Sequence, residues 1–83
     1  MARKNVEVIA TFDMHGKPTP IRARLITESG ENFILKVDRI KKTDTDKTAG
    51  NLMFRYHCEV FNEGVCTPFE LRYEIATCRW FLY

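Results

Sequence analysis

The chain has 83 residues, of which 45% are hydrophobic, 29% charged and 12% aromatic, and its formal net charge is +2. This length is enough for one domain, residues 1–83, and the ordinary globular composition excludes a disordered protein. Charges recur every few residues, so no segment is expected to be a signal peptide or a membrane span. The net charge is also too small to indicate a nucleic-acid partner by itself.

Hydrophobic residues recur at every second position over most of the chain, which is the pattern of half-buried β-strands. Turns rich in Gly, Pro, Asp and Asn divide the pattern, most clearly the loop 13–20. The apolar faces of five strands are predicted in chain order, followed by a short sixth strand: 6–12, 21–25, 33–37, 52–60, 65–75 and 79–83.

The polar stretch 41–51 interrupts this alternation. Thr43 and Asp46 have the spacing of a helix-start box, and Gly50 could end a helical turn. The sequence therefore predicts a polar loop here, with at most one short helical turn in 43–50.

The matching of the inward faces predicts how neighbouring strands pair. The apolar sets agree when Val60 lies opposite Val65 in one hairpin and Phe12 lies opposite Ile21 in another. Five or six antiparallel strands with one apolar face must curl to bury it. We therefore expect an all-β fold, a single small barrel or bent roll of the SH3-like or OB-like kind. The segment 79–83 is expected to close it against the first strand.

A basic face is predicted where the second and third strands turn outward and where the third ends. The same face carries Ile26 and Ile34, and basic residues beside apolar ones on a small barrel can hold single-stranded nucleic acid. No aromatic side chain shares this parity, so a solvated, mildly basic face is the competing interpretation. The candidate binding face consists of Arg22, Arg24, Lys36, Lys41 and Lys42.

The end of the chain is apolar on both parities, so one set of side chains faces the core and the other needs a cover. Cover from within the chain, such as the stretch 41–51, is the default, and a second copy or another protein is the alternative. The candidate partner surface consists of Trp80, Phe81, Leu82 and Tyr83.

The residues offer little material for catalysis or metal binding. His57 and Cys58 are neighbours in a strand and point to opposite faces, and Cys66 has the parity opposite to Cys58. Ser29, the only serine, lies in a turn, and neither histidine has an evident carboxylate beside it. We expect no metal, no cofactor and no enzymatic activity. Three cysteines without a Cys-x-x-Cys pair favour a reducing, cytoplasmic setting.

Several blocks of the chain carry a resemblance that spans nearly its whole length. The blocks are VEVIAxF at 6–12, GKPxPxRxR at 16–24, FELxYE at 69–74 and TCxWFL at 77–82. Together they resemble a family of short, uncharacterised all-β proteins from Gram-positive, clostridia-like bacteria. The resemblance implies a bacterial, cytoplasmic protein and no particular activity.

These observations favour a small non-catalytic accessory or protein-interaction module, whose partner is another protein or a second copy bound at the C-terminal segment. The alternative is weak, sequence-independent binding of single-stranded nucleic acid through the basic face. No membrane partner is expected.

Overall fold

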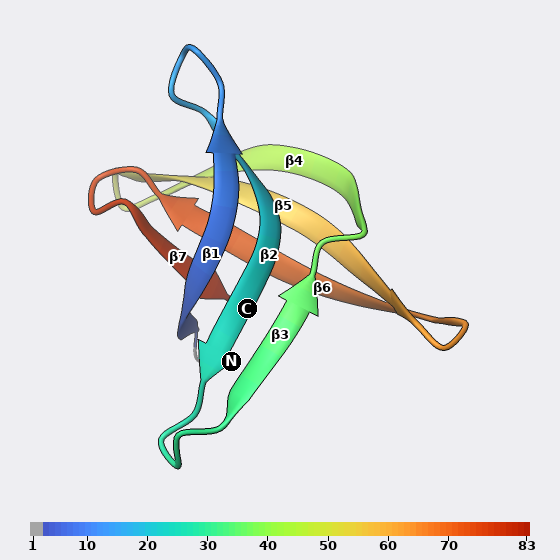
Figure 1. The fold of residues 1–83 in the computed structure, drawn as a ribbon. Helices are drawn as coiled ribbons and strands as arrows, with labels where there is room; N and C mark the ends of the chain where they lie inside the picture. The colour runs from blue at the N-terminus through green and yellow to red at the C-terminus, as the bar shows by residue number, and fades with distance from the viewer. Residues whose placement is uncertain (1–2) are drawn as a thin grey trace.

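The computed structural model describes residues 3–83, except for the side chain of residue 48. Every element is a β-strand, and all neighbouring strands are antiparallel, in the order β3-β2-β1-β7-β6-β5-β4 (Figure 1). The all-β expectation is confirmed, but the sheet has seven strands and forms a curled half-barrel. The strands are β1 (Lys4–Phe12), β2 (Pro18–Ile26), β3 (Asn32–Lys36), β4 (Arg39–Thr48), β5 (Asn51–Asn62), β6 (Val65–Glu74) and β7 (Arg79–Leu82).

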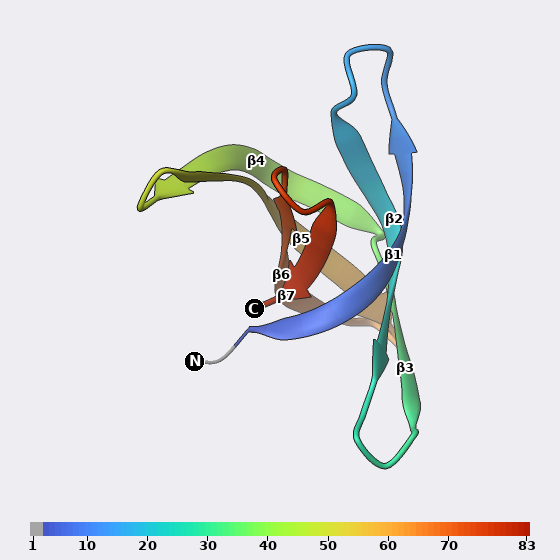
Figure 2. The ribbon, with the colours of Figure 1, turned by 90° about the vertical axis from the view of Figure 1, so that its left-hand side faces the viewer.

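The sheet curls so that β1, β2 and β3 stand across the ends of the other four strands (Figure 2). We call β1–β3 the N-terminal half and β4–β7 the C-terminal half. The start of β1 joins them, because Lys4, Asn5 and Val6 pair with β7 before the rest of β1 pairs with β2. The expected pairing of the last strand with the first is confirmed, and β7 also pairs with β6.

The core fills the concave side of the half-barrel. The rings of Tyr73 and Trp80 lie 4.9 Å apart, and Tyr56 packs against the same indole at 5.7 Å. The Tyr56 hydroxyl donates a hydrogen bond to the carbonyl of Pro18, which ties β5 to the start of β2. The central cluster comprises Ala23, Tyr56, Cys58, Leu71, Tyr73 and Trp80.

The pairing of β5 with β6 differs from the predicted register by two residues. Val60 lies opposite Thr67, because a two-residue turn at Glu63 and Gly64 connects the strands. Both turn residues have positive φ, 50° and 78°, as a type I′ hairpin turn requires. A shift by two residues keeps each side chain on its face, so the predicted inward face is right although the predicted partners are wrong.

The pairing of β1 with β2 departs further from the prediction. Phe12 lies opposite Pro18, and a β-bulge makes Ile21 an extra residue between the partners of Ile9 and Ala10. Inward parity therefore changes within β2, and Ile21 is exposed rather than internal. Phe12 keeps the inward side, with its ring 6.1 Å from that of Tyr73, but it lies at the end of β1 and is also exposed.

The predicted polar loop 41–51, with at most one helical turn, is wrong, because the residues up to Thr48 belong to the strand β4. It pairs with β5 along its length, with a bulge at Lys41 and a two-residue turn at Ala49 and Gly50 whose φ angles are 52° and 80°. Thr43 and Thr45 share the concave side with the side chains of β5 opposite them. The strand is polar because its convex side chains pair with charges on β5 and β6 rather than packing in the core.

Candidate functional site

Three of the five predicted basic residues lie together on the outer face of the N-terminal half. Arg22 lies opposite Lys36, and Arg24 lies opposite Ile34, in the pairing of β2 with β3. Arg24 also donates from Nε to a carboxylate oxygen of Glu7 on β1, at 2.7 Å. Within residues 3–83, Arg22 and Lys36 have no acidic partner, so two uncompensated positive charges face solvent here.

The other two basic residues belong to a different surface. Lys41 and Lys42 lie on β4, where the first ammonium is 4.0 Å from Glu59 and the second is 3.6 Å from Asp44. The structure therefore divides the predicted binding face. Of these five residues, only Arg22 and Lys36 have no acidic partner within residues 3–83.

Exposed isoleucines surround the two free cations. Ile9, Ile26 and Ile34 share their face, and Ile9 lies directly opposite Arg22. A shallow hollow of about 280 Å³ lies between them, lined by β1, β2 and Ile34. We define the β1–β3 outer face as Ile9, Arg22, Arg24, Ile26, Ile34 and Lys36. The sequence pattern contained Ile9, whose outward parity was visible, but nothing there showed that it lies beside Arg22.

The strand β3 forms one edge of the sheet. Thr27 N–H donates to the Glu31 carbonyl at 2.9 Å, and Val37 N–H donates to the Ile21 carbonyl at 3.0 Å. In an antiparallel pair, hydrogen-bonded and non-hydrogen-bonded residue pairs alternate. Between these two bonds, Asn32, Ile34 and Lys36 belong to non-hydrogen-bonded pairs, so their backbone N–H and C=O groups point away from β2. The edge is also apolar on both faces, since Phe33 and Ile34 are each 50% exposed.

The other edge, β4, carries the features that protect an edge strand from pairing. Its sequence RIKKTDTDKT places a charged residue at six of its ten positions, and the bulge at Lys41 distorts the ladder. Of the two edges, β3 is therefore the one suited to accept another strand.

The outer face of the C-terminal half is covered by an ion-pair network. Asp44 accepts a 2.7 Å hydrogen bond from Arg55, and Arg72 contacts Glu70 at 2.5 Å and Asp46 at 3.0 Å. The Arg55 guanidinium holds the pKa of the Asp44 carboxyl below its usual value. The charges of Asp44, Arg55, Asp46, Glu70 and Arg72 on this face therefore compensate one another.

Two carboxylates of this half are buried, Glu59 and Glu74. Glu59 is 7% exposed and accepts hydrogen bonds from Cys66 Sγ at 3.0 Å and from Arg39 Nε at 2.6 Å. These two hydrogen bonds hold the pKa of Glu59 below its usual value. The hydrogen bond to Glu59 in turn raises the pKa of the Cys66 thiol. Glu59 is therefore a structural anion and Cys66 a protonated donor.

The predicted partner surface at the end of the chain is largely covered by the chain itself. Trp80 and Phe81 are 8% and 3% exposed, and Leu82 and Tyr83 are half-buried. The guanidinium of Arg3 lies 3.9 Å from the Phe81 ring, and Arg72 covers Tyr83 at the same distance. Most of the exposed large apolar side chains of the strands lie instead on the N-terminal half, although Phe61 and Val65 are exposed at the far end of the β5–β6 hairpin.

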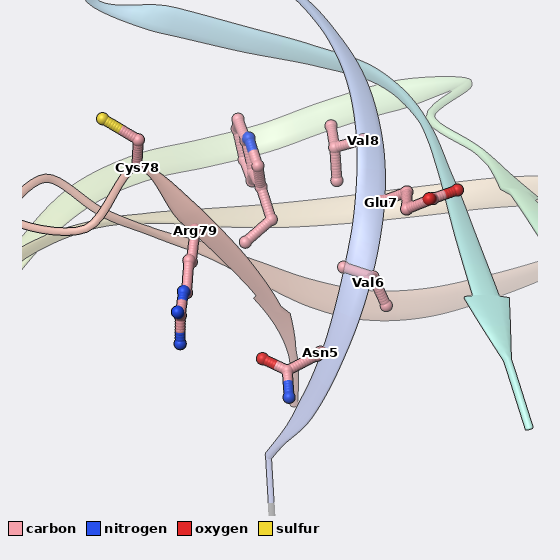
Figure 3. A pocket seen from close by; sticks show the side chains of 7 residues that line it. Asn5, Val6, Glu7, Val8, Cys78 and Arg79 are labelled. Atoms are coloured by element: carbon pink, nitrogen blue, oxygen red, sulfur yellow. The ribbon is translucent and has the colours of Figure 1, made fainter. Parts of the chain in front are cut away.

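A second hollow, of about 540 Å³, opens where β1 diverges from β7. Cys78 and Arg79 lie on one side of it and Val8 on the other (Figure 3). Glu7 points away toward β2, where it contacts Arg24 (Figure 3). The side chains around this hollow therefore do not converge on a common point.

Burial keeps the inner thiol and phenol protonated. It raises the pKa of Cys58 to about 11 and that of Tyr56 to about 12. Cys58 and Cys66 lie on opposite faces of the sheet, as their parity predicted. Across the described part of the chain, no three His, Cys, Asp or Glu side chains are grouped as metal ligands.

Comparison of the chain with protein-family models, with curated proteins and with solved structures finds no match in any of the three. No helix in residues 3–83 is long and apolar enough to cross a membrane. The geometry of the β1–β3 outer face and of the β3 edge is therefore the basis for assigning a function.

Proposed function

We propose that this protein is a non-catalytic, cytoplasmic protein-interaction module that binds an extended segment of a partner at the β3 edge. The observation that carries the proposal is the coincidence of three features at β3. These are outward-facing backbone groups, side chains half-exposed on both faces, and adjacent cations that have no acidic partner in residues 3–83. Addition of a strand to a sheet edge uses such features, because the backbone supplies affinity and the side chains supply specificity.

The state of the polar groups supports a non-catalytic role. A nucleophile or general base must have a free, reactive form near its substrate. Glu59 and Asp44 are held as ion-paired anions, and the thiols of Cys58 and Cys66 have raised pKa values.

Single-stranded nucleic acid is the second candidate, because Arg22 and Lys36 are free on the same face. Nucleobases bind such proteins chiefly by stacking on aromatic rings. The apolar residues of the β1–β3 outer face are isoleucines, and Phe33 has the opposite parity. The face therefore suits a peptide better than a nucleic acid.

A peptide-display selection against the immobilised protein tests the proposal, with amide NMR used to map where the selected peptides bind. We expect shifts in Asn32 to Lys36 and loss of binding in the variant Ile34→Pro. Proline there removes only an outward N–H, which an edge strand tolerates. The matched control is Thr45→Pro on the β4 edge, whose N–H also points outward because the pairing alternates from the Ala49–Gly50 turn.

The proposal is wrong if selected peptides bind with unchanged affinity to Ile34→Pro, or if their shifts map to the C-terminal half. A short oligonucleotide that perturbs the β1–β3 outer face, where no selected peptide does, would favour the second candidate. That binding should weaken steeply with salt, since counterion release drives it.

A further inference from the structure

We infer that the partner segment is acidic and apolar, and that it pairs alongside β3 as an eighth strand with a carboxylate beside Lys36. This inference rests on the proposed function and names the chemistry of the partner. It derives from the backbone of the edge, from the side chains on its two faces, and from the charges next to them.

The backbone determines the length and position of the segment. Outward N–H and C=O groups recur at Asn32, Ile34 and Lys36, so a strand of about five residues can complete the ladder. Asp38, the next residue of the outward series, ends this run, because its N–H donates to the Glu59 carbonyl on β5.

The exposed side chains determine which positions of the segment are apolar. On the outer face, the partner residue that lies beside Ile34 would contact the half-exposed side chain of Ile34. On the inner face, two neighbouring positions adjoin Phe33 and Leu35, of which the first is exposed and the second half-buried. Cross-strand neighbours of this kind stabilise a sheet when both are apolar. Three consecutive apolar residues therefore suit the centre of the segment.

The charge determines the flanking position. Lys36 lies at the edge and Arg22 lies directly behind it, and within residues 3–83 neither has an acidic partner. A carboxylate beside Lys36 would be near both cations. Arg24 contributes less, because it is already paired with Glu7.

A second copy of the chain matches this site less well. In the symmetric antiparallel pairing of two β3 strands about Ile34, the uncharged Asn32 of one copy would lie opposite Lys36 of the other. The positive charges of both copies would lack a directly opposed carboxylate. An acidic partner segment is the better complement, and self-association is an outcome that the experiment distinguishes.

Two synthetic peptides test the inference: Ser-Glu-Val-Ile-Val-Glu-Ser and the matched Ser-Lys-Val-Ile-Val-Lys-Ser. Their order is the same in both directions, so a charged residue lies beside Lys36 in parallel or antiparallel pairing. Affinities for the full chain are measured by NMR titration at about 50 mM and about 150 mM salt. We expect the glutamate peptide to bind about tenfold more tightly, with a smaller ratio at the higher salt.

Variants of the protein sharpen the result. Lys36→Glu should reverse the preference between the peptides, whereas Lys47→Glu, on the β4 edge, should leave the ratio unchanged. Ile34→Pro should abolish binding of both peptides, because it blocks the ladder that they share.

The outcomes separate this inference from the proposed function. Equal binding of both peptides at β3 overturns the inference and leaves the interaction module standing. If neither peptide binds, both the inference and the β3 edge as the docking site fail. A dimer in sedimentation analysis that Ile34→Pro dissociates assigns the edge to a second copy, which also overturns the inference.

Discussion

The two halves of the half-barrel treat their outer faces in opposite ways. On the C-terminal half, Arg55 and Arg72 are each bonded to carboxylates, and the apolar rings of the last strand are covered. On the N-terminal half, Arg22 and Lys36 have no acidic partner in residues 3–83 and lie among exposed isoleucines. The charges of the first face compensate one another, whereas those of the second are available for a ligand of opposite charge.

The two sheet edges follow the same division. The β4 edge is charged and bulged, whereas the β3 edge is short and has Phe33 and Ile34 half-exposed. Short length and flanking charge limit unwanted pairing at β3, but its apolar faces remain accessible. Most of the buried core belongs to the C-terminal half, and the proposed recognition site lies on the N-terminal half.

The largest expected effect comes from the core of the C-terminal half. Leu71 is 0% exposed, so Leu71→Ala should lower the free energy of unfolding by roughly 2–5 kcal/mol. Ile34→Thr, which removes exposed apolar surface but keeps a β-branched side chain, should change it by less than about 0.5 kcal/mol. Urea denaturation measures both. Equal losses would contradict the division between the halves.

An intermediate effect is expected at the hydrogen bond that connects the halves. Tyr56→Phe removes the donor to the Pro18 carbonyl and leaves a buried acceptor without its partner. We expect a loss of about 1–2 kcal/mol, together with faster amide exchange at the start of β2. If exchange is unchanged in β2, the hydrogen bond does not hold the N-terminal half against the core.

A smaller, pH-dependent effect is expected from the ion-paired outer face of the C-terminal half. The pKa values of Asp44, Glu59 and Glu74 are lowered by hydrogen bonds from Arg55, from Cys66 and Arg39, and from Thr77 and Asn51. Unfolded carboxyl groups bind protons more readily, so these contributions are complete above their ordinary pKa values. They are lost as the pH falls from about 5 toward 2.

The variant Glu59→Gln tests this assignment. It should lower stability at pH 7 and flatten the loss of stability on acidification, as followed by thermal unfolding at several pH values. The control is Glu7→Gln on the N-terminal half, whose pair with Arg24 is exposed and should contribute little. An acid profile that Glu59→Gln leaves unaltered would remove Glu59 from the network.

Alternation was enough to predict the all-β class and the inward faces of β5 and β6, and the need to cover a sheet edge predicted the pairing of β7 with β1. It could not determine the register, because a shift by two residues preserves every face. The two-residue turn at Glu63 and Gly64 makes that choice, and it depends on positive φ at a glutamate, which composition does not reveal.

The remaining errors also arise because the alternation of apolar residues does not show how the strands pair. The strand β4 has no apolar face to detect, since Arg55 and Arg72 on neighbouring strands pair with its aspartates. The bulge at Ile21 reverses parity within β2, and so an isoleucine expected in the core lies in solvent. Arg22, Arg24 and Lys36 share one outer face of β2 and β3, whereas the separation of Lys41 and Lys42 depended on β4, the strand that was missed.

The position of β7 has a consequence for how the chain folds during synthesis. This four-residue strand is the last of the seven to leave the ribosome, yet it lies between β1 and β6. Until it emerges, the β1–β2 and β5–β6 hairpins can form only as separate pieces, each with an open side. Their union spans most of the chain, so we expect slow assembly, in milliseconds to seconds, once β7 has emerged. Nascent chains that stall before Arg79 should be the most prone to aggregate.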